Sequence, residues 1–215
     1  MYVDVFQDTV CPWCRVGKKH LDQALAQWDG EAVEIRHHPF LLQPGMPTEG
    51  KNFVEHMTAI KGDANIEPML QRVCDAGSAC EVKFNFDKVA RIPNTLASHC
   101  LIALTPAERQ EEVVEAIFHA YFEAGRDIGA VETLLAIAAE QQLGLDRAEL
   151  SDALNDETFR AKIADEADWA RQQGITGVPF FVFNDLYAVS GAQPAEALLT
   201  ALRQAAAHTT VAAAV

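Results

Sequence analysis

"VCPWCRVGKK", residues 10–19, sets two cysteines three positions apart, with a proline and a tryptophan between them. The stretch follows "YVDVF" (2–6), which is rich in strand-forming residues, and it opens a segment with apolar residues at helical spacing up to about residue 28. "AVEIRHH" (32–38) then alternates in the manner of a strand. A strand, a helix and a second strand in this order predict a parallel pair of strands joined by a crossover helix.

Strand-like sequence returns only near the C-terminal end. Residues 39–52 hold three prolines and two glycines, which is typical of a linker, and helical patterns then continue to about residue 174. "VPFFVFND" (178–185) and "YAVSG" (187–191) are typical of strands, and the apolar run in the first favours a central strand covered on both faces. "PAEALLTALRQAAA" (194–207) opens with proline and predicts a closing helix.

These patterns predict an α/β fold in which a thioredoxin-like core, β-α-β followed by β-β-α, is interrupted by an inserted all-helical domain. We expect the core to comprise residues 1–40 and 174–207, and the insert to comprise residues 41–173. The last residues, 208–215, have little pattern and are predicted to form a disordered tail.

Capping residues predict where several helices begin and end. Asn94 and Thr105, the latter followed by a proline, are expected N-caps of two helices in the insert, and Asp156 is expected to cap the last one. Gly125 and Gly174 are placed to end helices.

Composition excludes several classes of protein. The 215 residues include 31 acidic and 17 basic side chains, for a net charge of −14, whereas nucleic-acid binding normally needs a basic face. No apolar run reaches the ~18–20 residues that span a bilayer, and "MYVDVF" lacks the features of a secretory signal. We therefore expect a cytoplasmic protein that binds neither membrane nor nucleic acid, and that is a monomer or a homodimer.

The position of the two cysteines favours redox chemistry. Cys11 precedes Pro12, a residue favoured in the first helical position, so Cys11 is the predicted N-cap, and its sulfur would face the free N–H groups and the positive end of the helix dipole. This setting favours the thiolate. Cys14 lies one turn later and is expected to be shielded, so Cys11 would attack or leave a disulfide and Cys14 would resolve the mixed disulfide. Arg15 adds positive charge in a direction that the sequence does not define.

A metal site and a structural disulfide are the competing interpretations of this pair. A zinc site would need two more ligands at suitable spacing. The candidates are His20, His37, His38, Cys74 and Cys80. Cys74 and Cys80 are spaced outside the usual range, and a disulfide between neighbours would restrain little of the unfolded chain. A C-x-x-C after a strand and at a helix start therefore favours a reactive dithiol without a metal or bound cofactor.

Four separated stretches resemble one family: "VCPWCRVGKKHL" (10–21), "HPFLLQPGMP" (38–47), "FNFDKVARIPNTLASH" (84–99) and "GITGVPFFVFNDLYAVSGAQP" (174–194). Together they resemble the DsbA-like thioredoxin-fold oxidoreductases, and most closely the FrnE-like cytoplasmic branch. The resemblance implies a thiol–disulfide oxidoreductase or isomerase that acts on protein or small-molecule disulfides or thiols, with glutathione as a potential co-substrate.

The resemblance also implies site residues that spacing does not reveal. It implies that Pro179 is preceded by a cis peptide bond and faces the dithiol, and that the backbone of Val178 pairs with an extended substrate. Pro12 and Trp13 would then lie against the substrate. The alternative is that Pro179 merely begins a strand.

The chain departs from the family pattern at three other cysteines. Cys100 stands where the family pattern has an arginine, and "CDAGSAC" (74–80) replaces an ordinary passage from helix to loop. If Gly77 ended the helix, Cys74 and Cys80 could form a second redox pair. The alternative is that Cys74 and Cys100 are small buried core residues.

Other functions remain open at this level. The same fold hosts glutathione-dependent isomerases and transferases of the 2-hydroxychromene-2-carboxylate isomerase type, which do not need a residue like Cys14, and a chaperone or binding module is a further class. His38, at the end of the second strand, could tune the thiolate or touch substrate, but a solvated strand-end histidine is the more ordinary interpretation.

Overall fold

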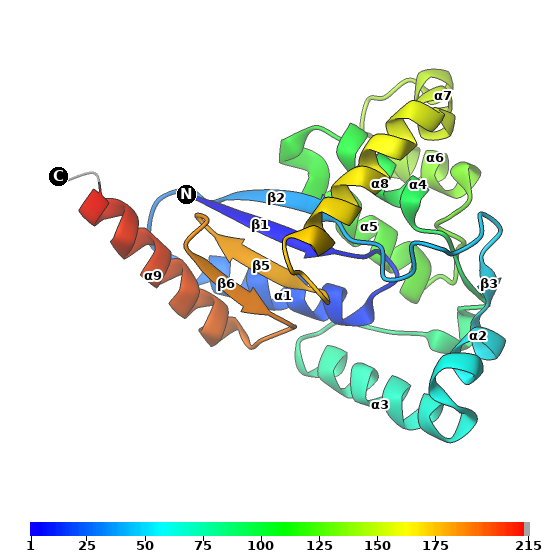
Figure 1. The fold of residues 1–215 in the computed structure, drawn as a ribbon, viewed down its shortest axis with the longest axis horizontal. Helices are drawn as coiled ribbons and strands as arrows, with labels where there is room; N and C mark the ends of the chain where they lie inside the picture. The colour runs from blue at the N-terminus through cyan, green and yellow to red at the C-terminus, as the bar shows by residue number, and fades with distance from the viewer. Residues whose placement is uncertain (213–215) are drawn as a thin grey trace.

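The computed structural model describes residues 1–212, and its centre is a four-stranded mixed sheet of order β2-β1-β5-β6. The strands are β1 (Tyr2–Gln7), β2 (Glu34–Pro39), β5 (Phe180–Phe183) and β6 (Tyr187–Ser190). β1 runs parallel to β2 and antiparallel to β5, so segments from the two ends of the sequence meet in the middle of the sheet (Figure 1). This arrangement confirms the predicted α/β thioredoxin-like core.

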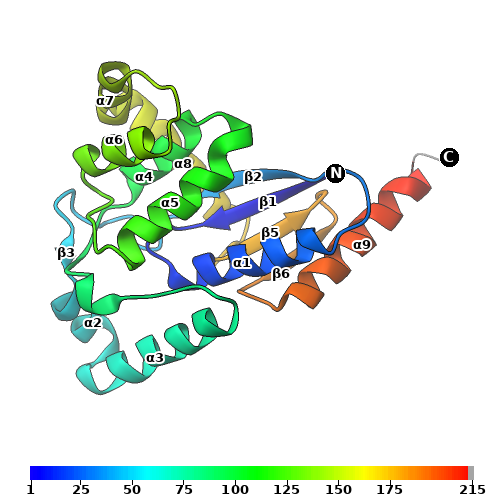
Figure 2. The same cartoon turned by 180° about the vertical axis from the view of Figure 1, so that it is seen from behind.

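One face of the sheet is covered by α1 (Pro12–Ala26) and α9 (Ala195–Ala212), which lie side by side in Figure 2. Strand side chains alternate, so every second residue of β1 and β5 points toward these helices. The fully buried ones are Val3, Val5, Phe181 and Phe183, which pack with Leu198 and Leu202 of α9. In β5 the alternate residues, Phe180 and Val182, are only half-buried, so this strand is fully covered on one face alone. The prediction of a strand covered on both faces is therefore wrong.

The insert supplies the remaining helices. They are α2 (Phe53–Lys61), α3 (Asp63–Ala79), α4 (Leu96–Leu104), α5 (Gln110–Phe122), α6 (Val131–Glu140), α7 (Arg147–Asn155) and α8 (Glu157–Gln172). α4 to α8 pack over the β2 side of the sheet, whereas α2 and α3 form a separate pair near the start of α1 (Figures 1 and 2). A two-residue ribbon, β3 (Lys51–Asn52) with β4 (Arg91–Ile92), ties the α2–α3 pair to the rest, and the sequence pattern did not predict it.

The insert has its own hydrophobic core, and the dithiol segment borders it. Phe118 and Phe122 of α5 and Leu101 of α4 are fully buried in this core. Cys11 and Cys14 belong to the same cluster of buried side chains. The start of α1 is therefore held by contacts with the insert as well as by the sheet.

Two predicted helix starts are wrong by a few residues. α4 begins at Leu96, and the Asn94 side chain accepts a hydrogen bond from the Leu96 amide at 3.0 Å. Thr105 is not an N-cap, because its hydroxyl donates to the carbonyl of Leu101 in the preceding helix at 2.8 Å. A short 3₁₀ turn (Ala107–Arg109) then precedes α5.

The other predicted caps are confirmed. The Asp156 side chain accepts from the amide of Phe159 at 2.8 Å, and Gly125 and Gly174 have φ values of +70° and +86°, which favour glycine at a helix end. α9 extends beyond the predicted end at residue 207, to Ala212. The prediction of a disordered tail falls partly on residues 213–215, which lie outside the described part of the chain. None of the described helices has both the length and the apolar composition needed to cross a membrane.

Candidate dithiol site

Cys11 occupies the N-cap of α1, as its position before Pro12 predicts. Its backbone is extended (φ −88°, ψ 109°), and Pro12 takes the first helical position, where a missing N–H costs nothing. The Cys11 carbonyl accepts from the Cys14 amide at 3.0 Å, and the Cys11 amide donates to the Asp8 carbonyl at 2.9 Å. The first turn of α1 therefore holds both cysteines in a fixed relation to the end of β1.

The two cysteines differ in environment. Both are free thiols, and the exposed fractions are 5% for Cys11 and 1% for Cys14. Burial raises the pKa of Cys14 well above its ordinary value, and its hydrogen bond with Cys11 raises the pKa further. Cys14 is therefore held as a thiol at neutral pH, which is the property expected of a resolving rather than an attacking residue.

The loop before β5 lies against Cys11. The Val178–Pro179 peptide bond is cis, as the family resemblance implied, and the Cys11 thiol donates to the Val178 carbonyl with a sulfur–oxygen distance of 3.7 Å. This loop and α1 approach each other closely at Gly17, where an added Cβ would lie 2.7 Å from Cγ of Pro179. The absence of a side chain at Gly17 therefore allows this approach.

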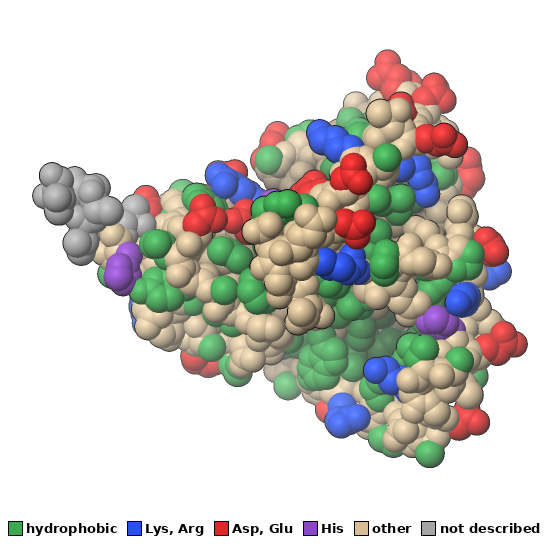
Figure 3. Space-filling model, viewed as in Figure 1, with side chains coloured by type: hydrophobic (Ala, Val, Ile, Leu, Met, Phe, Trp, Pro, Cys, Tyr) green, Lys and Arg blue, Asp and Glu red, His purple; other side chains and the backbone are tan. Residues whose placement is uncertain are grey.

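The surroundings of Cys11 include exposed apolar surface. Trp13 is 40% exposed and Leu42 is 43% exposed, whereas Pro12 is half-buried. Figure 3 shows hydrophobic side chains gathered in a hollow between the α2–α3 pair and the sheet. An extended chain could lie against such a surface.

A buried acid, Asp8, connects the segment before Cys11 to neighbouring segments through its carboxylate. The sequence analysis did not identify this residue. Asp8 is 1% exposed, and its carboxylate accepts from the Leu42 amide at 2.7 Å. Its other oxygen lies 3.6 Å from Nε2 of His99, which α4 supplies. The hydroxyls of Thr9 and Ser98 join the same two segments at 2.7 Å. The only available signal was the polar run "QDT" directly after an apolar strand.

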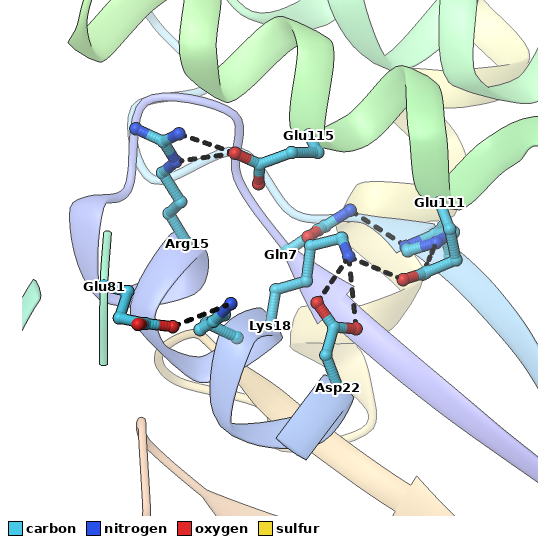
Figure 4. A network of polar contacts seen from close by, with 9 residues as sticks. Gln7, Arg15, Lys18, Asp22, Glu81, Glu111 and Glu115 are labelled. Atoms are coloured by element: carbon cyan, nitrogen blue, oxygen red, sulfur yellow. Dashed lines mark hydrogen bonds and ion pairs between the residues drawn. The ribbon is translucent and has the colours of Figure 1, made fainter. Parts of the chain in front are cut away.

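Arg15 is directed away from the dithiol. Its guanidinium contacts the carboxylates of Glu115 and Glu123 at 2.5 and 2.6 Å and donates to the Lys83 carbonyl at 2.8 Å. Figure 4 shows the side chain reaching toward Glu115 on α5. With an exposed fraction of 4%, Arg15 secures α1 to the insert, and its charge is committed to these acids.

A second charged network joins α1, α5 and β2 (Figure 4). Lys18 contacts Glu111 at 2.7 Å and Asp22 at 3.1 Å, and His37 contacts the other oxygen of Glu111. Burial opposes ionisation of Glu111, but the hydrogen bond from His37 and the charge of Lys18 outweigh it and lower its pKa to about 2. His37 also bonds Gln7, with 3.0 Å between the ring and amide nitrogens.

His38 is not the solvated strand-end histidine that we expected. Its two ring nitrogens bond Asp4 at 2.9 Å and Glu166 at 3.0 Å, and its ring stacks on Phe6 with centroids 4.7 Å apart. Burial would lower its pKa, but the hydrogen bonds with Asp4 and Glu166 prevail and raise it to about 9. His38 therefore joins the sheet to α8 as a cation.

The structure does not support a second redox pair. α3 continues through Gly77 to Ala79, so the expected break between Cys74 and Cys80 is absent. Six residues along a helix place their Cα atoms about 9 Å apart, beyond the reach of a disulfide. Cys80 packs on Val16 of α1, and Cys74 is half-buried on another side of α3.

Cys100 is a core residue. It is fully buried in the hydrophobic core of the insert, and burial raises its pKa to about 11. Among the described residues, no cluster of three or more histidine, cysteine or acidic side chains could hold a metal ion.

Known proteins resemble this chain over almost its whole length. A family model described as the DSBA-like thioredoxin domain matches residues 2–203. The uncharacterized protein YwbO of Bacillus subtilis (strain 168) is 27% identical over 187 residues, which cover 86% of this chain and 88% of YwbO. Among solved structures, the probable DsbA oxidoreductase SCO1869 from Streptomyces coelicolor is 31% identical, with a TM-score of 0.83, over 95% of this chain and 89% of that chain.

A more distant structure shares the fold. The cytosolic disulfide reductase DsbM from Pseudomonas aeruginosa, solved with GSH, aligns over 100% of both chains with a TM-score of 0.63 and 19% identity.

Proposed function

The chain belongs to the family of DSBA-like thioredoxin domains, and on that premise we propose that Cys11 and Cys14 are its redox-active dithiol. The family is one of thiol–disulfide oxidoreductases. In our proposal Cys11 is the nucleophile, Cys14 is the resolving thiol, and the substrates are disulfides or thiols of proteins or small molecules.

The asymmetry between the two thiols is the observation that carries the proposal. Cys11 occupies the N-cap of α1, and its thiol lies beside the Val178 carbonyl. Cys14 is more deeply buried, and its raised pKa keeps it protonated until a mixed disulfide forms. Such a division of roles is what a two-step exchange requires.

The exchange balances without a bound cofactor. The Cys11 thiolate attacks one sulfur of a substrate disulfide, so that a Cys11–substrate bond forms and the other substrate sulfur leaves as a thiolate. Cys14 then loses its proton and attacks the Cys11 sulfur, so that the Cys11–Cys14 bond forms and the second substrate thiolate leaves. The substrate gains two electrons and the dithiol becomes a disulfide; oxidation of a substrate dithiol is the reverse.

Substrate binding in this proposal uses the backbone of the loop before Pro179. Val178 lies beside Cys11, so an extended substrate segment could pair with its backbone while its sulfur meets Cys11. Trp13 and Pro12 would supply apolar contact to the same segment. We propose a cytoplasmic location and glutathione as a small-molecule substrate, since the similarly folded DsbM is described as cytosolic and was solved with GSH.

The Cys14→Ser variant tests this function. It should retain attack by Cys11 but lose resolution, so a disulfide-containing peptide should remain attached, as a mass increase that dithiothreitol removes. Cys11→Ser is the matched control and should trap nothing under the same conditions. Trapping of equal amounts by both variants, or by neither, would contradict the assignment of roles.

The same variant separates the alternative, a glutathione-dependent isomerase or transferase. That activity would not require Cys14, so Cys14→Ser would keep full turnover of a glutathione-linked substrate. We expect instead that, with no free thiol present, reduced Cys14→Ser stops at the mixed disulfide, whereas the reduced wild type goes on to release the second substrate thiol.

A further inference from the structure

A cavity of about 300 Å³ lies on the face of the sheet that α1 and α9 leave uncovered. It is formed between the last turn of α8 and strands β1 and β5, on the side of the sheet turned toward the viewer in Figure 1. No cysteine lines it. Its size is at the lower end of the range for small-ligand sites, and neither the proposed dithiol chemistry nor the family match assigns a function to it.

Three aromatic rings form its apolar walls. Phe6 lies 6.5 Å from Trp169 and 6.4 Å from Phe180, measured between ring centroids. Phe6 is buried and Phe180 is half-buried, whereas Trp169 is 48% exposed and is accessible from solvent. The faces of such rings carry partial negative charge and attract cations.

The polar groups of the cavity are also suited to a cation. The carboxylates of Asp4 and Asp185 line it, and so do Gln173 and Gly174, which follow the C-terminal end of the 16-residue helix α8. The C-terminal end of a helix carries partial negative charge. The nearest arginine of α8, Arg171, is turned elsewhere, with its guanidinium over the ring of Phe40 at 4.5 Å.

His38 shows that this environment already stabilises one planar cation. Its ring lies flat on Phe6 and bonds Asp4 and Glu166. The charged groups around the cavity and on the adjoining face of β2 are the carboxylates of Asp4, Asp185, Glu166 and Glu34, against the imidazolium of His38 and the guanidinium of Arg36, which pairs with Glu34. The carboxylates still outnumber the cations, and Asp185, which accepts a hydrogen bond from the Tyr2 hydroxyl, lies on the exposed side of the cavity with Trp169.

We propose that this cavity is a binding site for an organic cation with a planar guanidinium group, which stacks on Trp169 and pairs with Asp185. The proposal does not depend on the dithiol function. The guanidinium could come from a free small molecule or from an arginine side chain of a polypeptide, because both present the same planar donor group.

The test uses two matched probes and the indole resonances of the protein. N-acetyl-argininamide carries the guanidinium, and N-acetyl-citrullinamide replaces it by an uncharged urea group of the same shape. In ¹H–¹⁵N spectra of the full chain, which has three tryptophans, the argininamide should shift the indole N–H signal of Trp169 in a saturable manner. The citrulline probe should leave this signal unchanged.

Two variants and a control locate the site. Trp169→Ala should weaken binding about fivefold, in line with a cation–π contact at a partly exposed site. Asp185→Asn should weaken it about threefold, the scale of an exposed ion pair. Asparagine also suits the backbone there, since Asp185 has φ +56°. Asp152→Asn, the same change of charge on exposed α7, should leave the affinity unchanged.

The outcomes separate this proposal from the dithiol function. Equal response to the two probes, or equal affinity in Asp185→Asn and Asp152→Asn, would overturn the cation site, whatever the redox assays give. Cys11→Ser should bind the argininamide as the wild type does. A blocked peptide with one arginine should bind tighter than the free probe if the source is a polypeptide, and no tighter if it is a small molecule; both results support the site.

Discussion

At the scale of single residues, the environment of a side chain decides its chemistry more than its type does. The chain has five free cysteines, yet only Cys11 combines an N-cap position with a contact to the Val178 carbonyl. The two adjacent histidines of β2 differ in the same way: His37 bonds Glu111 and Gln7, and His38 bridges Asp4 and Glu166. Neither role could be predicted from the dipeptide itself, because the partners come from distant segments.

His38 makes stability depend on pH in a defined direction. Its pKa rises from an ordinary value of 6.5 to about 9 in the folded state, so its contribution is complete below pH 6.5 and is lost as the pH rises through 9. We expect the free energy of unfolding, measured with urea, to fall by roughly 2 kcal/mol over this interval.

The matched variant for this prediction is His38→Gln, which keeps a hydrogen-bonding side chain without a titrating charge. Its unfolding free energy should be lower than that of the wild type at pH 6 and should change less between pH 6.5 and 9. Parallel pH curves for the two proteins would show that another group is responsible.

At the scale of helices and strands, local sequence predicted most elements near the site. β1, β2, β5, β6 and α1 were predicted because their patterns are contained within each segment. The β3–β4 ribbon was missed because two residues carry no periodicity, and the starts of α4 and α5 shifted because side chains of the preceding turn competed for the caps. The contact between α1 and the Pro179 loop was also beyond a local pattern, since it joins residues about 160 positions apart.

That contact predicts a cost for a minimal substitution, Gly17→Ala. The new Cβ would lie 2.7 Å from Cγ of Pro179, so α1 or the loop must move. Alanine favours a helix interior by about 1 kcal/mol over glycine, but overpacking typically costs about 1–3 kcal/mol. We expect a net loss of about 1 kcal/mol in urea unfolding, together with slower disulfide exchange, because the loop that carries Val178 is displaced.

Gly45→Ala is the control, because an added Cβ there meets nothing within 4 Å. It should change the unfolding free energy by less than about 0.5 kcal/mol. A Gly17→Ala variant that is more stable than the wild type and equally active would show that the contact is not tight in solution.

At the scale of the whole molecule, the sequence predicted the order of the parts better than their arrangement. The core and the helical insert follow from alternation and helical spacing along the chain. That the insert separates into the α2–α3 pair and the α4–α8 group, with His99 braced against Asp8, depends on tertiary packing that single-segment patterns do not contain. The expected end of α3 at Gly77, on which the second cysteine pair depended, was wrong for the same reason.

The arrangement predicts a single disulfide in the oxidised protein. After mild oxidation and alkylation, peptide mass mapping should find Cys11 linked to Cys14, and alkylated thiols at Cys74, Cys80 and Cys100 after unfolding. Reduced protein carried through the same procedure is the control and should show five alkylated cysteines. A Cys74–Cys80 link would mean that the last turns of α3 open in solution.

The pairing of β1 with β5 also has a consequence for synthesis on the ribosome. Val3 lies opposite Phe183, so the central pairing of the sheet joins residues 180 positions apart, and it cannot form until most of the polypeptide has been translated. Until then Cys11 and Cys14 belong to a nascent chain whose strand β5 and loop of Val178 and Pro179 have not yet emerged. Translation must therefore be nearly complete before Cys11 and Cys14 are buried by the folded sheet. Until then, other thiols and chaperones of the cell can reach these two cysteines.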